Sequence, residues 1–171
     1  MKRQHLFPSL GIAICAWAAI VAPLSHAEPQ APVTITAVRL EVAHANRTAR
    51  FIGKVKVTQT QAAGSFVLES DAVQVEYGGT GKGGAISRLE AQGNVVLSKP
   101  GNPPEMATGD KAVYTPAQRG QEAQLVLSGR SVTLSRGPSR LTGDRLVYSL
   151  KTQQATVTNS QGSVKATFVP Q

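Results

Sequence analysis

The chain repeats one short pattern three times: an aspartate, a spacer, an apolar residue, a second spacer and a second apolar residue. The copies begin at Asp71, Asp110 and Asp144, which are 39 and 34 residues apart, and a divergent copy begins at Val38, 33 residues before Asp71. A second strand pattern that starts with glycine follows each copy, at Gly53, Gly93, Gly129 and Gly162. Such a period marks supersecondary units that stack because none can bury an apolar face alone. We therefore expect function to lie along the stack rather than at one catalytic point.

Apolar and polar residues alternate with period two through most of the chain after residue 32. Val38, Leu40 and Val42, for example, face one way, while Arg39 and Glu41 face the other. This alternation is typical of half-buried strands. Glycine and proline turn signals separate the alternating segments, and no segment carries a long helical stripe. The pattern predicts an all-β chain.

The alternation changes its parity at each repeated aspartate. Leu68 lies three residues before Asp71, whereas Val73 lies two residues after it. The two halves of the strand would face opposite ways unless an extra residue were inserted, and a small residue precedes each aspartate, as a bulge or bend favours. We interpret each aspartate as a corner where a strand bends between two sheets, with its carboxylate accepting hydrogen bonds from freed backbone N–H groups. This role is structural, not catalytic.

The first 27 residues have the features of a secretory signal peptide. Lys2 and Arg3 form a basic start, residues 10–22 are all apolar, and small residues stand at positions 25 and 27. The 13 residues of that apolar stretch are fewer than the roughly 20 of a membrane-spanning helix, so we expect cleavage after Ala27 rather than a retained anchor. The predicted organisation is a signal peptide (1–27), a linker (28–33) and a β domain (34–169).

Cys15 lies in the predicted signal peptide, so the mature chain of 144 residues contains no cysteine. A domain of that length can be stabilised by its own core without disulfides. Together with the bacterial style of the signal, this indicates the periplasm.

Basic residues exceed acidic ones, but they are scattered. Without Lys2 and Arg3, the 18 basic residues fall to 16 against 10 acidic ones, a formal charge of +6 for the mature chain. An exported protein rarely meets nucleic acid, so we expect no nucleic-acid partner. The polyanions outside the inner membrane are anionic lipids and phosphorylated glycolipids, although a merely soluble basic surface explains the charge equally well.

Catalytic machinery is hard to assemble from this sequence. The mature chain has one histidine, His44, no thiol and no Gly-x-Ser-x-Gly elbow. The segment from Gly79 to Gly84 matches a dinucleotide fingerprint, but no helix or βαβ pattern follows it, so we interpret it as a hairpin tip. We expect no enzyme activity, no cofactor and no metal site, although a glycosidase with two carboxylates stays open because nothing singles out a pair.

Four stretches, in this order, carry a resemblance to a known family: Ile35 to Val42 leading to Phe51 to Val55, Leu68 to Val75, Leu89 to Val95, and Leu141 to Asp144. With the signal peptide and the overall length, they resemble the OstA-like family of periplasmic lipopolysaccharide-transport proteins, and within it the soluble bridge component. The resemblance covers about Ile35 to Phe168. Two departures are Val38, where the family usually has Asp, and the segment from Gly129 to Val132, whose one additional residue suggests a bulge.

The resemblance implies an open β-jellyroll: two antiparallel sheets in a V shape with an apolar groove between them. It implies a protein that conducts lipopolysaccharide from an inner-membrane complex to an outer-membrane translocon. The partners implied are the lipid A acyl chains, the inner-membrane anchor component at the N-terminal side, the translocon at the C-terminal side, and further copies of the chain joined head to tail.

On this basis the apolar positions of the strands are candidates for lining the groove, although ordinary core packing is the alternative for each. They are Leu40, Phe51, Val55, Leu68, Val73, Val75, Leu89, Val95, Leu97, Leu125, Leu127, Leu134, Leu146 and Tyr148. The best candidates near the groove mouth for contacts with lipid phosphates are Lys54, Arg136, Arg140 and Arg145, which solvated strand faces would also explain. The first strand is predicted over 34–42 and the last over 163–169; the residues that mark these partner edges are Ile35, Val38, Val42, Val164 and Phe168.

Two other interpretations stay open. One is a β-solenoid scaffold or carbohydrate-active protein with a filled core and chemistry on one face. The other is the membrane-anchored sister of the same transport chain, which shares the jellyroll but retains its N-terminal helix.

Overall fold

A computed structural model describes residues 32–61, 64–78, 85–117 and 121–169. The predicted signal peptide, residues 28–31 of the predicted linker and the hairpin tip at 79–84 lie outside these ranges. In the described part of the chain, no helix is long and apolar enough to span a membrane.

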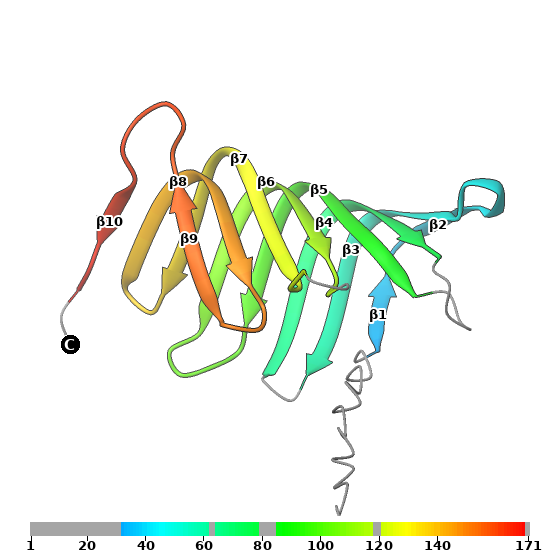
Figure 1. The fold of residues 1–171 in the computed structure, drawn as a ribbon, viewed down its shortest axis with the longest axis horizontal. Helices are drawn as coiled ribbons and strands as arrows, with labels where there is room; N and C mark the ends of the chain where they lie inside the picture. The colour runs from blue at the N-terminus through cyan, green and yellow to red at the C-terminus, as the bar shows by residue number, and fades with distance from the viewer. Residues whose placement is uncertain (1–31, 62–63, 79–84, 118–120, 170–171) are drawn as a thin grey trace, which may run out of the picture. The chain divides into compact units, whose positions relative to one another are not determined.

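The described residues form an antiparallel β domain, as the alternation predicts (Figure 1). Its strands are β1 (Val33–Thr36), β2 (Arg39–Ala43), β3 (Thr48–Gln61), β4 (Gly64–Tyr77), β5 (Ile86–Lys99), β6 (Glu105–Thr115), β7 (Gln124–Arg136), β8 (Ser139–Ser149), β9 (Gln154–Thr158) and β10 (Lys165–Thr167). A single 3-10 turn, η1 (His44–Asn46), separates β2 from β3 within the described ranges. Consecutive strands from β3 to β8 pair with one another, so most pairing is between neighbours in the sequence.

Register shifts divide the six long strands into two layers. The first layer consists of β1, 55–61, 64–70, 95–99, 105–109, 132–136, 139–143 and β10. The second layer consists of β2, 48–52, 72–77, 86–92, 111–115, 124–128, 145–149 and β9. Each long strand therefore contributes one half to each layer, as the bent strands of Figure 1 show.

The corners between the layers are β-bulges on alternate strands. Gly53 and Lys54 have φ angles of 83° and 47°, and Gly93 and Asn94 have φ angles of 79° and 47°. At each of these bulges, the two residues with positive φ lie opposite a single residue of the neighbouring strand, and the bulged strand bends there. That one residue is Asp71, which lies between both bulges. Glycine is needed at position 93 because a Cβ there would collide with the Asp71 carboxylate.

The change of parity at the aspartates is confirmed. Leu68 and Ser70 are buried before Asp71, and Val73 and Val75 are buried after it. The odd offset thus places both halves of the strand against one interior, because the strand bends at the aspartate. The bulge predicted at 129–132 is also confirmed: the register between β7 and β8 shifts between Ser128 and Val132.

The ends of the domain differ from the predicted end strands. The strand predicted over 34–42 is two strands, β1 and β2, interrupted at Ala37 and Val38. The interruption is a corner of the same kind, because the Val38 N–H donates a 3.0 Å hydrogen bond to the Gly53 carbonyl oxygen. A valine can therefore occupy the first corner without a carboxylate. At the other end, β10 covers only 165–167 of the strand predicted over 163–169, and β9, which the sequence did not indicate, pairs with β8.

Candidate functional site

The predicted groove residues converge on one interior between the two layers. Eleven of the fourteen are buried in the core: Val55, Leu68, Val73, Val75, Leu89, Val95, Leu97, Leu125, Leu127, Leu146 and Tyr148. Phe51 and Leu134 are partly buried and pack against that core. Leu40 is the exception, since it lies on β2 with 53% of its surface exposed. Alternation thus identified inward positions on five of the six long strands, but it included none from β6, whose buried residues are Ala107 and Ala112, and it did not indicate the outlying position of β2.

The interior is closely packed. The largest fully buried side chains, among them Val73 and Leu127, are at most 1% exposed. A cavity of about 50 Å³ lies between Val57, Phe66 and Leu97 of the first layer and Leu89, Leu125 and Tyr148 of the second. Ligand pockets typically measure roughly 300–1,000 Å³. An acyl chain could enter this interior only if the layers moved apart.

One lysine crosses from the first layer to the second at the end of the strands farthest from the corners. Lys99, the last residue of β5, donates hydrogen bonds from Nζ to Gln153 Oε1 at 3.1 Å and to Tyr148 Oη at 3.4 Å. The same Nζ lies 5.6 Å from the centroid of the Phe66 ring, and the Phe66 and Tyr148 rings meet edge to face at 6.1 Å. We call Phe66, Lys99, Tyr148 and Gln153 the mouth cluster. Sequence reasoning missed Lys99, although alternation places it on the same face as Leu97.

The four predicted phosphate contacts are all exposed, but they do not lie together. Arg136 ends β7 on the same face as Leu134 and pairs in register with Glu105, which in turn pairs with Lys99. Arg140 pairs with Ser135 on the opposite face. Lys54 and Arg145 lie at corners, where the strands bend. Of the four, Arg136 is the one at the same rim as the mouth cluster.

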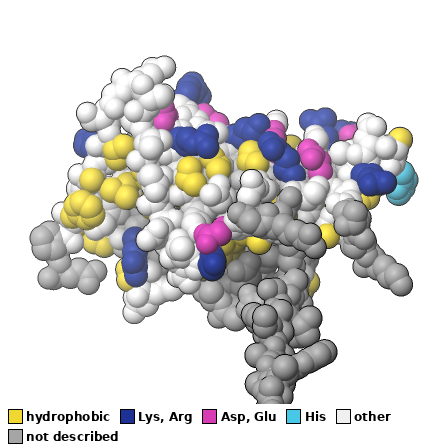
Figure 2. Space-filling model, viewed as in Figure 1, with side chains coloured by type: hydrophobic (Ala, Val, Ile, Leu, Met, Phe, Trp, Pro, Cys, Tyr) yellow, Lys and Arg dark blue, Asp and Glu magenta, His cyan; other side chains and the backbone are white. Residues whose placement is uncertain are grey.

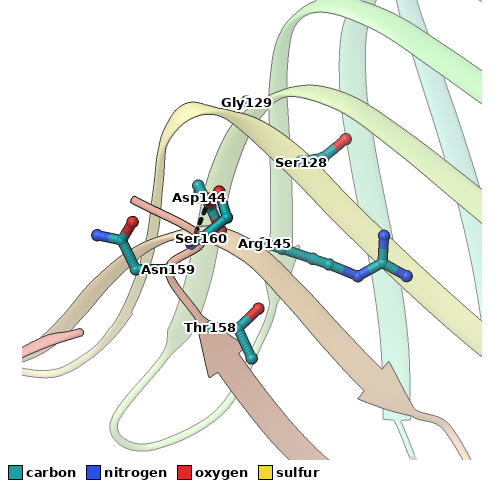
Figure 3. A pocket seen from close by; sticks show the side chains of 7 residues that line it. All are labelled: Ser128, Gly129, Asp144, Arg145, Thr158, Asn159 and Ser160. Carbon is teal, nitrogen blue, oxygen red and sulfur yellow. Dashed lines mark hydrogen bonds between the residues drawn. The ribbon is translucent and has the colours of Figure 1, made fainter. Parts of the chain in front are cut away.

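The repeated aspartates accept hydrogen bonds at the corners, and for Asp110 and Asp144 a backbone N–H is a donor, as predicted. Asp144 Oδ2 accepts a 2.7 Å hydrogen bond from the Ser160 N–H and another from the Ser160 hydroxyl (Figure 3). These hydrogen bonds lower the pKa of Asp144. Asp110 accepts from the Arg130 N–H at 2.9 Å, whereas Asp71 accepts from the Asn94 side-chain amide at 2.8 Å.

The Asp144 corner borders an open concavity of about 540 Å³ that also contains Ser128, Arg145 and Asn159. Figure 3 shows the Arg145 side chain extending away from Asp144, whose carboxylate faces Ser160. The Asp144 carboxylate already accepts two hydrogen bonds from Ser160. We therefore assign it a structural role at the corner rather than a role in acid–base chemistry. In the ranges that the structure describes, no group of three or more His, Cys, Asp or Glu residues could hold a metal ion.

Residues 34–154 match the family model described as the LptA and LptD N-terminal domain lipopolysaccharide-transport proteins. The chain belongs to this family. The matched segment begins at Thr34, within β1, and ends at Gln154, the first residue of β9, so it spans strand halves of both layers.

The chain is also similar to two known proteins, one by sequence and one by structure. A protein of Rhizobium meliloti (strain 1021), described as uncharacterized, is 29% identical over 145 residues, which are 82% of this chain and 72% of the relative. The crystal structure of LptH, described as the LptA-homologous periplasmic component of the lipopolysaccharide transport device of Pseudomonas aeruginosa, matches with a TM-score of 0.65. That match has 19% identity and covers 82% of this chain and 96% of LptH. At this identity the similarity shows the fold, which is the all-β jellyroll that the family resemblance implied.

As in the expected jellyroll, the strands at both ends of this family member leave unpaired edges. Among the described strands, β1 and β2 pair with β3 alone, and β9 and β10 pair with β8 alone. Large exposed apolar side chains lie at these ends: Val38 (77% exposed), Leu40 and Val42 at one, and Val164, Phe168 (74% exposed) and Val169 at the other. Ile35, the remaining predicted edge residue, is partly buried and packs against the core.

The outer surface carries mixed charges. In Figure 2 the Lys and Arg side chains are spread along the visible face with Asp and Glu between them, rather than gathered into one basic patch. The tightest group surrounds Glu90 on the outer face of the second layer: its carboxylate lies 2.7 Å from Lys111 Nζ and 3.0 Å from an Arg88 guanidinium nitrogen. The hydrogen bond from Lys111, with contributions from Gln92 and Arg88, lowers the Glu90 pKa to about 2.

Proposed function

We propose that the protein is a periplasmic bridge that binds lipopolysaccharide and conducts it between an inner-membrane complex and an outer-membrane translocon. Membership of a lipopolysaccharide-transport family supports this proposal. The observation that carries it is the single apolar interior to which all six long strands contribute, and which runs along the stack between the two layers. The path is built from repeated strand halves rather than from one pocket.

The energetics favour a protein path for such a lipid. Each buried methylene is worth roughly 0.8 kcal/mol, so exposing an acyl chain of about a dozen carbons to water costs on the order of 10 kcal/mol. An apolar interior removes this cost without chemistry. No covalent step is needed, and the energy for directional movement comes from outside this chain.

The layers must separate to admit acyl chains, because the present cavity of about 50 Å³ is too small. The corners are suitable hinges, since their bulges already interrupt the regular ladder between the two halves of each strand. Opening there would part the inner faces while preserving the pairing of strands within each layer.

The unpaired end strands support the proposed partners. Exposed edges are templates for strand addition, and an end-to-end contact between unlike edges does not close on itself. We propose that β1 and β2 dock on the inner-membrane anchor component or on the β9 and β10 end of a preceding copy. The β9 and β10 end would then meet the next copy or the outer-membrane translocon.

A pair of neighbouring residues provides the test. A photo-crosslinking benzoylphenylalanine at Phe66, which lines the cavity, should capture purified lipopolysaccharide. The same amino acid at Val67, on the opposite face of β4 by alternation, should not. Equal capture at both positions would contradict binding between the layers.

The fold argues against one alternative, the β-solenoid scaffold or carbohydrate-active protein, because every pair of described strands is antiparallel and each long strand belongs to both layers. The membrane-anchored sister differs in residues 1–31, which lie outside the described ranges. N-terminal sequencing of the exported protein distinguishes them: a start at Glu28 supports the soluble bridge.

A further inference from the structure

The mouth cluster combines a cation with an apolar entrance. Lys99 belongs to the first layer, yet both of its hydrogen-bond partners, Tyr148 and Gln153, belong to the second layer or to the turn that follows it. Tyr148 is buried, and its ring contacts Phe66 across the gap between the layers. The cluster therefore spans the two layers beside the cavity between them.

The partners of Lys99 are neutral. Among the described residues, no carboxylate forms an ion pair with its ammonium group. Glu105 faces Lys99 in register on β6, and Arg136 faces Glu105 on β7, so the rim retains one net positive charge. An ionised oxygen attracts the ammonium group through a charge–charge interaction that the neutral oxygens of Tyr148 and Gln153 do not provide. An anionic oxygen at this rim would compete effectively with the Tyr148 and Gln153 oxygens.

We propose that Lys99 binds the phosphate headgroup of an amphiphile whose acyl chain passes between Phe66 and Tyr148. This inference rests on the proposed function, and it names the residue that recognises the headgroup. When Lys99 turns to the phosphate, it releases the Tyr148 and Gln153 oxygens, and the bridge that it forms across the mouth between the two layers is lost. Recognition of the headgroup and separation of the layers then become one event, because the ligand favours the open state only through contacts that the closed state lacks.

Substitution of Lys99 by methionine tests the role of the charge. Lys99→Met keeps an unbranched apolar stem over Phe66 while removing the ammonium group. Lys56→Met removes the same charge from an exposed position of β3, beside Glu69 on the outer surface, and serves as the matched control. Lys99→Arg restores the charge, and the melting temperature of each variant establishes that it is folded.

Three probes distinguish the possible ligands: lipid A with both phosphates, dephosphorylated lipid A, and inorganic phosphate. We expect Lys99→Met to bind phosphorylated lipid A about tenfold more weakly than wild type, with Lys56→Met unchanged and Lys99→Arg restored. Dephosphorylated lipid A should bind wild type and Lys99→Met equally well, or the variant more tightly because its mouth is no longer held shut. Inorganic phosphate at the same concentration should not displace lipid A.

Each contrary result has a distinct meaning. Equal weakening for both forms of lipid A, or no weakening for the phosphorylated form, would overturn the assignment of Lys99 as the headgroup residue and leave the proposed function intact. Displacement of lipid A by inorganic phosphate would assign the site to free phosphate instead. Failure of the wild-type protein to bind either lipid would overturn the proposed function and this inference together.

Discussion

The carboxylate of Asp110 accepts a 2.9 Å hydrogen bond from the backbone N–H of Arg130, which lies in the bulge of the adjacent strand. The bulge frees this N–H from the ladder between β6 and β7, where the register shifts. One side chain thus replaces the strand pairing that the bend removes. The same need explains Asp144, which accepts from the Ser160 N–H, whereas Asp71 accepts from the Asn94 side-chain amide.

Removing that acceptor should destabilise the domain. We expect Asp110→Ala to lower the free energy of unfolding by about 1 kcal/mol, because an N–H loses its partner at a site that remains open to water. Urea denaturation followed by circular dichroism measures the change. Asp110→Asn retains an acceptor oxygen and is the control; a loss of the same size in both variants would show that the hydrogen bond is not responsible.

The two faces of β7 should respond very differently to truncation. Leu127 is 0% exposed, so Leu127→Ala should cost about 3–5 kcal/mol through lost burial and the cavity left behind. Val126, its neighbour on the outer face, is only partly buried, and Val126→Ala should cost less than about 1.5 kcal/mol. Chemical denaturation of the two variants tests this. Similar losses of stability in the two variants would mean that Leu127 is not held in a closely packed core, as expected if the groove were already open.

Acid should weaken the contribution of Glu90 to stability. Its pKa is about 2 in the folded protein and 4.5 in the ordinary state, so the unfolded chain binds more protons between these values. The contribution is complete above about pH 5 and is lost as the pH falls through 4.5 towards 2. Glu90→Gln should therefore cost about 1 kcal/mol near neutral pH and little near pH 2. Denaturation at both pH values checks this, and a constant difference would contradict it.

Truncation of the last strand should separate assembly from folding. Residues 164–169 are exposed in this structure, so a chain ending at Ser163 should keep its core and its melting temperature within a few degrees. The same chain should lose head-to-tail self-association, because the edge of the first layer at that end is altered. Light scattering measures association. Normal assembly of the truncated chain would contradict docking through the end strands.

Much of this architecture could be predicted from local pattern, because strand alternation and neighbouring pairs are local properties. Leu68 and Val73 show this clearly: their odd separation predicted the bend that brings both into one interior. The roles of Lys99 and Gln153 could not be predicted in the same way. They are 54 residues apart, and their contact depends on how closely the two layers approach. The exposure of Leu40 could not be predicted either, because β2 alternates like the strands that have a neighbour on both edges, although β2 itself pairs with β3 alone.

The end strands are divided between the layers, and this division limits how two copies can be arranged. β1 extends the first layer and β2 the second, just as β10 and β9 do at the other end. A neighbour that paired with one edge alone could swivel about that contact. A neighbour that continues both edges is fixed in rotation, so its interior is aligned with that of the first copy. The interruption at Val38, which separates β1 from β2, would therefore fix the rotation of one copy relative to the next. The angle between β1 and β2 would set the helical pitch of a chain of copies.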